Sequence, residues 1–332
     1  MKISKLLYLL LASLTFSALA GNQELLQGVQ EVDRLAFGTC NKQYFPQPLW
    51  PAIMKDAPDL WLAGGDNVYV NDENPDKIKA AYQAQDLISD FALLRTFIPV
   101  IGLWDDHDFT NDNANGKYKH KDLSQRYFLD FMQEPLVSKR RMQNGIYTSY
   151  SFGPKERRIK FILLDTRYFK DVHADSPILG RTQWRWLERE LRDSKAKLIF
   201  LASGYPILAP DMPLSVEWAD YPGEKERLLK AVKKIKTPIM FLTGDKHFSS
   251  IYRGSDNHVE FMSSGMTHNT RAPLRPYVRQ KFPNYMFDFN YSVVDIAWEN
   301  SIPSLDLSIR NVSGKPVIGQ KLIWTSGKWQ NQ

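Results

Sequence analysis

Short apolar runs, many of them rich in β-branched residues, alternate with stretches of helical periodicity along most of this chain. Such runs predict buried strands, and their alternation with helices predicts an α/β architecture. The predicted strands are residues 34–38, 60–63, 100–103, 159–164, 198–202, 239–242, 259–262, 292–298, 304–309 and 321–324.

Apolar residues at helical spacing predict helices over residues 75–95, 123–133, 182–192 and 223–234. Thr182 stands in the N-cap position of the third helix, ahead of a Trp and Leu stripe that is typical of a core-facing surface. After about residue 255 the pattern becomes mainly β, which predicts a second sheet closing the same core. No linker divides the chain, so residues 21–332 are predicted to form one domain.

Residues 1–20 have the pattern of a signal peptide. Lys2 and Lys5 supply positive charge, an apolar run follows, and Ala18-Leu19-Ala20 is a small-residue cleavage site. The run is too short to span a bilayer comfortably, although an uncleaved anchor is the alternative. We therefore expect a secreted or periplasmic protein with no stable membrane span after cleavage.

The charge of the chain is mildly basic. The formal net charge of +6 falls to +4 when Lys2 and Lys5 are removed with the signal peptide. The remaining Lys and Arg residues are scattered, so the sequence predicts no nucleic-acid-binding surface. A hydrophobic content of 43% is ample for a substantial core and excludes a disordered or fibrous chain.

Cys40 is the only cysteine of the chain. A single thiol excludes internal disulfides, and a free thiol in an exported protein is a liability. Taken alone, Cys40 has three interpretations: an apolar filler, half of an intermolecular bridge, or a metal ligand.

Four of the predicted strands end in polar clusters, and in α/β sheets the loops beyond the carboxyl ends of the strands build the site. We expect these loops to bring together Cys40, Asp66, Tyr69, Asp106, His107, Asp245 and His247. Glycines at 38, 64, 65 and 244 are expected to let the backbone turn sharply. The clusters are Gly38-Thr39-Cys40, Gly64-Gly65-Asp66-Asn67-Val68-Tyr69, Trp104-Asp105-Asp106-His107-Asp108 and Gly244-Asp245-Lys246-His247.

These residue types suit polyvalent cations. Asp oxygens can bridge two ions, His supplies neutral nitrogen, and Tyr and Cys anions favour ferric iron or zinc. Two neighbouring ions can activate a water molecule for attack on phosphorus. The alternative, in which the same residues serve only as turns and caps, leaves the carboxylates around His107 to repel one another without a cation.

At these clusters the sequence resembles the PhoD-like (alkaline phosphatase D) branch of the calcineurin-like metallophosphoesterases, and Leu164-Asp165-Thr166-Arg167 adds a further matching motif. The resemblance implies a four-layer sandwich of two mixed β-sheets flanked by helices, the metallophosphoesterase fold. It also implies phosphomonoesterase or phosphodiesterase activity, and a centre holding Fe³⁺ beside Ca²⁺. Zn²⁺ or another divalent metal is the alternative.

Carried over by resemblance, the metal ligands are Cys40, Asp66, Tyr69, Asp245 and His247. Asp106 stands where relatives have an Asn ligand, and Asn111 is a further ligand candidate. His107 stands where relatives place the His that stabilises the transition state or protonates the leaving group, so His107 and Asp106 are the catalytic candidates.

Three residues are candidates for substrate binding: Arg95, Arg167 and His268. Relatives often hold phosphate with an arginine between the second and third motifs, where Arg95 is the only arginine of this chain. Arg167 could bind phosphate or form a structural pair with Asp165. The chain departs from the family pattern at Thr39, where Ser is common, and at Asp108, where Glu is common. It also has no room for the extra N-terminal β-domain of many relatives.

The expected function is metal-dependent hydrolysis of small phosphate esters or diesters. A second hypothesis is a diesterase acting on phospholipid headgroups or teichoic acid, for which the aromatic stretch 205–221 and the basic segment 271–281 would form the surface. A third is a catalytically silent protein that binds metal or phosphate.

Overall fold

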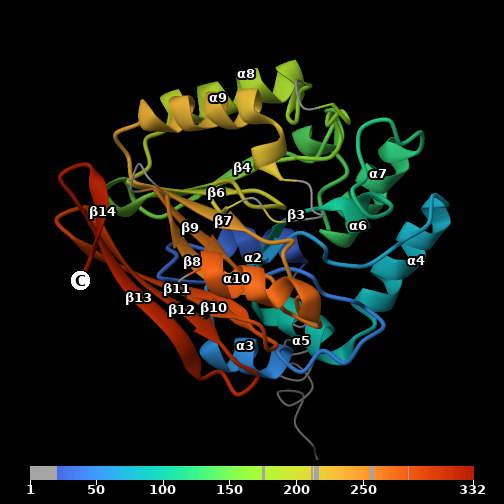
Figure 1. The fold of residues 1–332 in the computed structure, drawn as a ribbon, viewed down its shortest axis with the longest axis horizontal. Coiled ribbons are helices and arrows are strands. Elements are labelled where there is room, and N and C mark those ends of the chain that lie inside the picture. The colour runs from blue at the N-terminus through green and yellow to red at the C-terminus, as the bar shows by residue number, and fades with distance from the viewer. Residues whose placement is uncertain (1–20, 174–175, 211, 213–216, 255–257, 283) are drawn as a thin grey trace, which may run out of the picture.

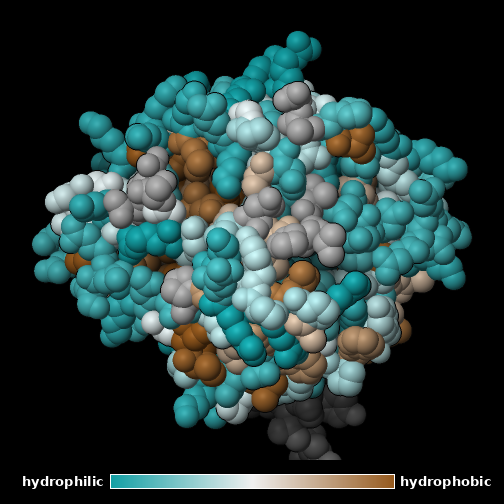
Figure 2. Space-filling view, viewed as in Figure 1, coloured by the Kyte–Doolittle hydropathy of each residue, from teal (hydrophilic) through white to brown (hydrophobic). Residues whose placement is uncertain are grey.

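The computed structural model describes residues 21–173, 176–210, 212, 217–254, 258–282 and 284–332. The predicted signal peptide at 1–20 lies outside them. Within the described ranges, no helix combines the length and apolar character needed to cross a bilayer. The face drawn in Figure 2 is mainly hydrophilic, and its apolar side chains form separate small patches.

Two seven-stranded sheets form the centre of the fold. The first has the order β14-β13-β12-β11-β1-β2-β3, and the second has the order β10-β8-β9-β7-β6-β5-β4. The first sheet comprises β1 (Arg34–Gly38), β2 (Leu60–Gly64), β3 (Val100–Leu103), β11 (Tyr291–Glu299), β12 (Ile302–Arg310), β13 (Pro316–Thr325) and β14 (Lys328–Asn331). The second comprises β4 (Thr148–Phe152), β5 (Ile159–Leu163), β6 (Leu198–Ala202), β7 (Ile239–Thr243), β8 (Ser249–Arg253), β9 (Val259–Met262) and β10 (Tyr285–Met286).

Both sheets are mixed. Strands β1, β2 and β3 run parallel, as do β5, β6, β7 and β9, whereas the flanking strands pair antiparallel. The inner faces of the sheets pack together, and the rings of Phe37 on β1 and Phe261 on β9 meet edge to face at 5.2 Å. Burial of these apolar faces is the main stabilising contribution to the sandwich.

Helices cover both outer faces (Figure 1). Helices α8 (Gly180–Arg192) and α9 (Pro222–Lys233) bury Trp184 and Leu228 against the second sheet. On the first sheet, Trp50 of α3 (Trp50–Asp56) packs against Trp61 of β2 at 5.3 Å and against Phe91 of α5 (Ser89–Phe97) at 4.9 Å. The remaining helical segments are α2 (Asn22–Gly28), α4 (Pro75–Asp86), α6 (Asp106–Phe109), α7 (Lys121–Phe131), α10 (Arg275–Lys281) and the 3₁₀ turns Lys139–Arg141, Lys155–Arg157, Trp218–Asp220 and Ala272–Leu274.

The predicted four-layer α/β sandwich and all ten predicted strands are therefore confirmed, with ends that shift by a few residues. The short strands β4, β8, β10 and β14 were not predicted. The C-terminal prediction was wrong in one respect. Strands β11–β14 do not form a sheet of their own, because β11 pairs antiparallel with the free edge of β1 and so extends the first sheet.

Two helix predictions also need correction. The helix expected over 75–95 is broken at Ile88, whose extended backbone separates α4 from α5 and lets Phe91 and Leu94 face the core. Thr182 is not an N-cap, because α8 begins at Gly180 after Leu179, with no side-chain cap hydrogen bond.

The Thr39 side chain explains why glycine is needed at two strand ends. A Cβ atom on Gly64 would lie 2.7 Å from the Thr39 side chain, and one on Gly244 would lie 2.4 Å from it. Thr39 cannot easily move, because its hydroxyl donates to the Ser263 carbonyl at 2.9 Å. Of the four strand-end glycines that were expected to turn the backbone sharply, only Gly65 has a positive φ, +112°. Gly64 and Gly244 are thus required for close approach of two loops rather than for the sharp turns expected from the sequence.

Gly244→Ala is expected to lower the free energy of unfolding by about 1–3 kcal/mol, the usual cost of overpacking, because the new methyl group must displace the anchored Thr39 side chain. Gly223→Ala is the control, since a Cβ atom there meets nothing within 4 Å. Urea denaturation of both variants measures the difference. Equal stabilities would contradict the packing argument.

Candidate metal centre

The loops that follow β1, β2, β3 and β7 converge, as the sequence predicts. Among the described residues, the potential ligand atoms form three overlapping groups, and within each group they lie within 4.8 Å of one another. Asp66 belongs to the first two groups and Asp106 to the last two, so the groups form one continuous cluster. The groups are Cys40 with Asp66 and His247; Asp66 with Asp106 and His107; and Asp105 with Asp106 and Asp245.

Tyr69 lies among three imidazole rings. Its hydroxyl is 3.2 Å from Nε2 of His247, and its ring stacks on His107 with centroids 4.2 Å apart. The ring of His268 meets Tyr69 edge to face at 5.0 Å and lies 4.1 Å from the ring of His247. Tyr69 therefore lies between His107 and the first ligand group, through its contact with His247.

Four of the candidate ligands adopt left-handed backbone conformations. The φ angles are 64° at Cys40, 49° at Asp66, 75° at Asp245 and 59° at His247. This region is unfavourable for side chains with a Cβ atom and costs about 1–3 kcal/mol for each residue, and such residues gather at functional sites. The backbone strain here coincides with the residues that the chemistry singles out.

Asp108 joins two of the loops without belonging to the three ligand groups. Its buried carboxylate accepts hydrogen bonds from the backbone N–H groups of Asn67 at 3.0 Å and Val68 at 3.3 Å, both in the β2 loop. It also accepts from the backbone N–H of Asp105 at 2.9 Å and from the Tyr82 hydroxyl at 3.1 Å. Asp108 thereby fixes the β2 loop, with Asp66, to the β3 loop, with Asp106.

Buried cations accompany the carboxylates. Arg167 contacts Asp105 at 2.5 Å, with both side chains about 1% exposed, and lies 3.8 Å from Asp106. Lys246 contacts Asp245 at 2.5 Å and Glu217 at 2.9 Å. Each of these cations offsets part of the negative charge of the cluster.

The compensation is incomplete. Burial raises the pKa of Asp66 well above its usual range, and the carboxylate of Asp106 raises it further. Burial also raises the pKa of Asp105 to about 7 despite the ion pair with Arg167. At Asp106 the effect of burial is outweighed by Arg167 and His107, which leave its pKa below the usual range. Charges in such an arrangement favour a bound cation.

The imidazoles offer lone pairs to such a cation. Burial lowers the pKa of His247 to about 4, so its ring is neutral at pH 7, the form that binds metal. The Thr267 hydroxyl donates to the Cys40 carbonyl, which leaves it to accept from Nδ1 of His268 at 3.3 Å. Nε2 of His268 then carries a lone pair, and it is buried with no hydrogen-bond partner, as is Oδ2 of Asp105. The donor set fits a metal centre.

Some predicted site residues do not join the cluster. Arg95 pairs with Asp86 and donates to the Phe131 carbonyl, so its guanidinium is held between α4, α5 and α7. The carbonyl of Asn111 accepts from the backbone N–H of Ala114, and a ligand role for its amide stays a prediction.

Arg167 joins the cluster through a partner that was not predicted. Asp165 accepts from the backbone N–H groups of Arg167 and Tyr168, and this turn directs the Arg167 side chain inward to Asp105. The structural pair with Asp165 is therefore a backbone contact only. Sequence reasoning also missed Asp105 as a ligand candidate, although it lies in the same motif as Asp106, and it missed Glu217, for which no local signal exists.

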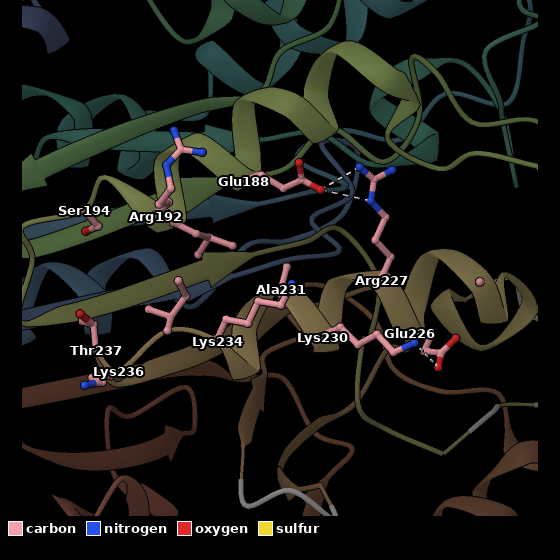
Figure 3. A pocket seen from close by; sticks show the side chains of 13 residues that line it. Glu188, Arg192, Ser194, Glu226, Arg227, Lys230, Ala231, Lys234, Lys236 and Thr237 are labelled. Carbon is pink, nitrogen blue, oxygen red and sulfur yellow. Dashed lines mark hydrogen bonds and ion pairs between the residues drawn. The ribbon is translucent and has the colours of Figure 1, made fainter.

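A cavity elsewhere in the fold is separate from the ligand cluster. A cavity of about 750 Å³ lies between α8 and α9, and its lining residues are separate from the cluster (Figure 3). Arg227 pairs there with Glu188, and Lys230 pairs with Glu226. Its basic residues gather near the C-terminal ends of the two helices, where positive charge offsets the helix dipole.

Comparisons with known proteins agree with this geometry. The family model of the PhoD-like phosphatases matches residues 36–292. The fold is similar to the solved structure of PhoD, with a TM-score of 0.68 and 16% identity over 91% of this chain and 71% of that one. It is also similar to a dimetal phosphatase from Danio rerio, with a TM-score of 0.60 and 12% identity over 89% and 100%. Among curated proteins, no match is found.

Asp108→Asn is expected to destabilise the protein by about 1–3 kcal/mol, because an amide nitrogen would face buried N–H donors. The variant should also retain less metal, since the β2 and β3 loops lose their common acceptor. Tyr82→Phe, which removes one donor of the set, should cost only about 1 kcal/mol. Urea denaturation and elemental analysis test both variants, and full metal retention in Asp108→Asn would refute the linking role.

Proposed function

Because this chain belongs to the PhoD-like phosphatase family, we propose that it is a metal-dependent hydrolase of phosphate monoesters or diesters. The main support is the continuous cluster of ligand atoms that Asp66 and Asp106 connect. Shared carboxylates of this kind suit a pair of neighbouring ions. The similarity of the fold to a dimetal phosphatase supports the same proposal.

The donors divide by chemical type. Cys40, Tyr69 and His247 lie at one end with Asp66, and thiolate and phenolate ligands suit Fe³⁺ or Zn²⁺. Asp105, Asp106 and Asp245 lie at the other end, and carboxylate oxygens suit Ca²⁺. When bound, such ions supply Lewis acidity and a nucleophile derived from water at neutral pH.

His107 is positioned for proton transfer. Its Nδ1 lies 3.1 Å from the Val70 carbonyl, which can only accept, so Nδ1 carries a proton. Nε2 is then the nitrogen that can exchange a proton with the oxygen of a departing alcohol. Stacking on Tyr69 fixes the plane of the ring. We assign His107 to leaving-group protonation.

The proposal includes export from the cytoplasm. Its support is the pattern of residues 1–20 alone: Lys2 and Lys5, the apolar run and the small-residue cleavage site.

Removal of metal should abolish hydrolysis of p-nitrophenyl phosphate and bis(p-nitrophenyl) phosphate, and addition of Fe³⁺ with Ca²⁺, or of Zn²⁺, should restore it. Asp245→Asn should lower turnover by at least about 100-fold, since even groups that only support ligands are worth roughly 10- to 100-fold. Asp193→Asn, which alters an exposed partner of Arg192, is the matched control. Undiminished activity after chelation would end this proposal.

Tyr69→Phe should abolish the phenolate-to-iron charge-transfer absorption band if the centre holds Fe³⁺, because Tyr69 would supply the phenolate. Tyr82→Phe should leave the band unchanged, since the Tyr82 hydroxyl donates to Asp108. Absorption spectra, with iron content measured on the same samples, separate loss of the ligand from loss of the metal. An unchanged spectrum in iron-loaded Tyr69→Phe would exclude Tyr69 as an iron ligand.

A further inference from the structure

In the part of the chain that the structure describes, three buried cations lie near the carboxylate cluster, and two of them have carboxylate partners. Arg167 pairs with Asp105, and Lys246 pairs with Glu217 and Asp245. The third is Lys170, whose side chain is only 3% exposed. Among the residues that the structure describes, Lys170 forms no ion pair with a carboxylate.

The backbone fixes Lys170 beside the cluster. The N–H of Lys170 donates to the Arg167 carbonyl at 3.2 Å, so both residues lie on one turn after β5. The N–H of Gly116 donates to the Lys170 carbonyl at 2.8 Å, and the N–H of Asn113 in the same segment donates to Asp106 at 2.6 Å. Segment 113–116 therefore connects Lys170 to Asp106.

The side chains of Lys170 and Arg167 lie near the same aromatic ring. The Lys170 ammonium lies 5.9 Å from the centre of the Tyr205 ring, and the Arg167 guanidinium lies 4.8 Å from the same ring. Oδ2 of Asp105, the partner of Arg167, is a buried acceptor without a hydrogen-bond partner. The Lys170 ammonium therefore lies near Arg167 and its partner Asp105, without a carboxylate partner of its own in the described part of the chain.

We propose that Lys170 binds the phosphoryl oxygens of the substrate and takes the role that Arg95 was expected to fill. This inference rests on the proposed function. It follows from the charge of the loaded centre, where bound cations would neutralise the carboxylates and leave the Lys170 ammonium without a counter-ion. A phosphate group supplies that negative charge and accepts hydrogen bonds from Lys.

The ammonium also favours one class of ester. A phosphomonoester near neutral pH carries close to two negative charges, whereas a diester carries one. The contribution of Lys170 is therefore larger for monoesters. Lys170 is a specificity-determining residue of the site.

The test compares Lys170→Met, Lys170→Gln and Lys170→Arg in the metal-loaded protein. The Met and Gln variants should raise the KM for p-nitrophenyl phosphate and the inhibition constant of inorganic phosphate by about tenfold or more, the effect of one charge-assisted hydrogen bond. The KM for bis(p-nitrophenyl) phosphate should rise less. Lys170→Arg should restore most of the phosphate affinity.

Lys160→Met is the matched control, because Lys160 is a buried lysine on β5 that pairs with Glu190 outside the cluster. It should cost stability and leave the KM and phosphate inhibition unchanged. The inference is overturned if fully metal-loaded Lys170→Met keeps the wild-type phosphate affinity. It is also overturned if both the Met and Gln variants lose metal or fail to fold, since Lys170 is then structural.

Failure of the proposed function gives a separate result. If the metal-loaded wild-type protein hydrolyses neither ester, the enzymatic proposal fails. Calorimetric titration with inorganic phosphate then tests Lys170 by itself. Weaker binding to Lys170→Gln supports the phosphate site, and equal binding or none in both proteins overturns it.

Discussion

Repulsion among buried carboxylates is the constraint that the centre of this protein must satisfy. Asp66, Asp105 and Asp106 are nearly inaccessible to solvent, and Asp245 lies against them. Without compensation, such a group would protonate or force the loops apart. The fold supplies buried cationic partners for two of the carboxylates and several N–H donors around Asp108. It also places the ligand atoms in a geometry that suits cations.

The framework around the cluster keeps these loops from relaxing. Thr39 fills the space between Gly64 and Gly244, so the ends of β1, β2 and β7 interlock by shape. Strained backbone at Cys40, Asp66, Asp245 and His247 persists only because neighbouring structure determines it. Rigid support of this kind keeps ligand atoms in place before any ion arrives, which lowers the reorganisation that binding requires.

The sequence was sufficient for the features that depend on local pattern. Each polar cluster directly follows a short apolar run, and strand direction alone then predicts that Cys40, Asp66 and Asp245 meet. Features that depend on pairing between distant segments were beyond its reach. The edge of β1 could accept β11 only once the sheet order was known, and the break at Ile88 directs Arg95 to Asp86 instead of to the site. Lys170 differs from Arg167 and Lys246 in its ion pairing, and the sequence does not show which lysine or arginine pairs with a carboxylate.

The ligand groups also come from both halves of the sandwich. Cys40, Asp66 and Asp106 follow strands of the first sheet, whereas Asp245 and His247 follow β7 of the second. An ion held by residues of both sheets would therefore act as a cross-link at one end of the sandwich, and its binding free energy would add to that of folding. The loaded protein should separate its two sheets more slowly at that end, and conditions that strip the ion would loosen the seam there before the apolar interior is exposed.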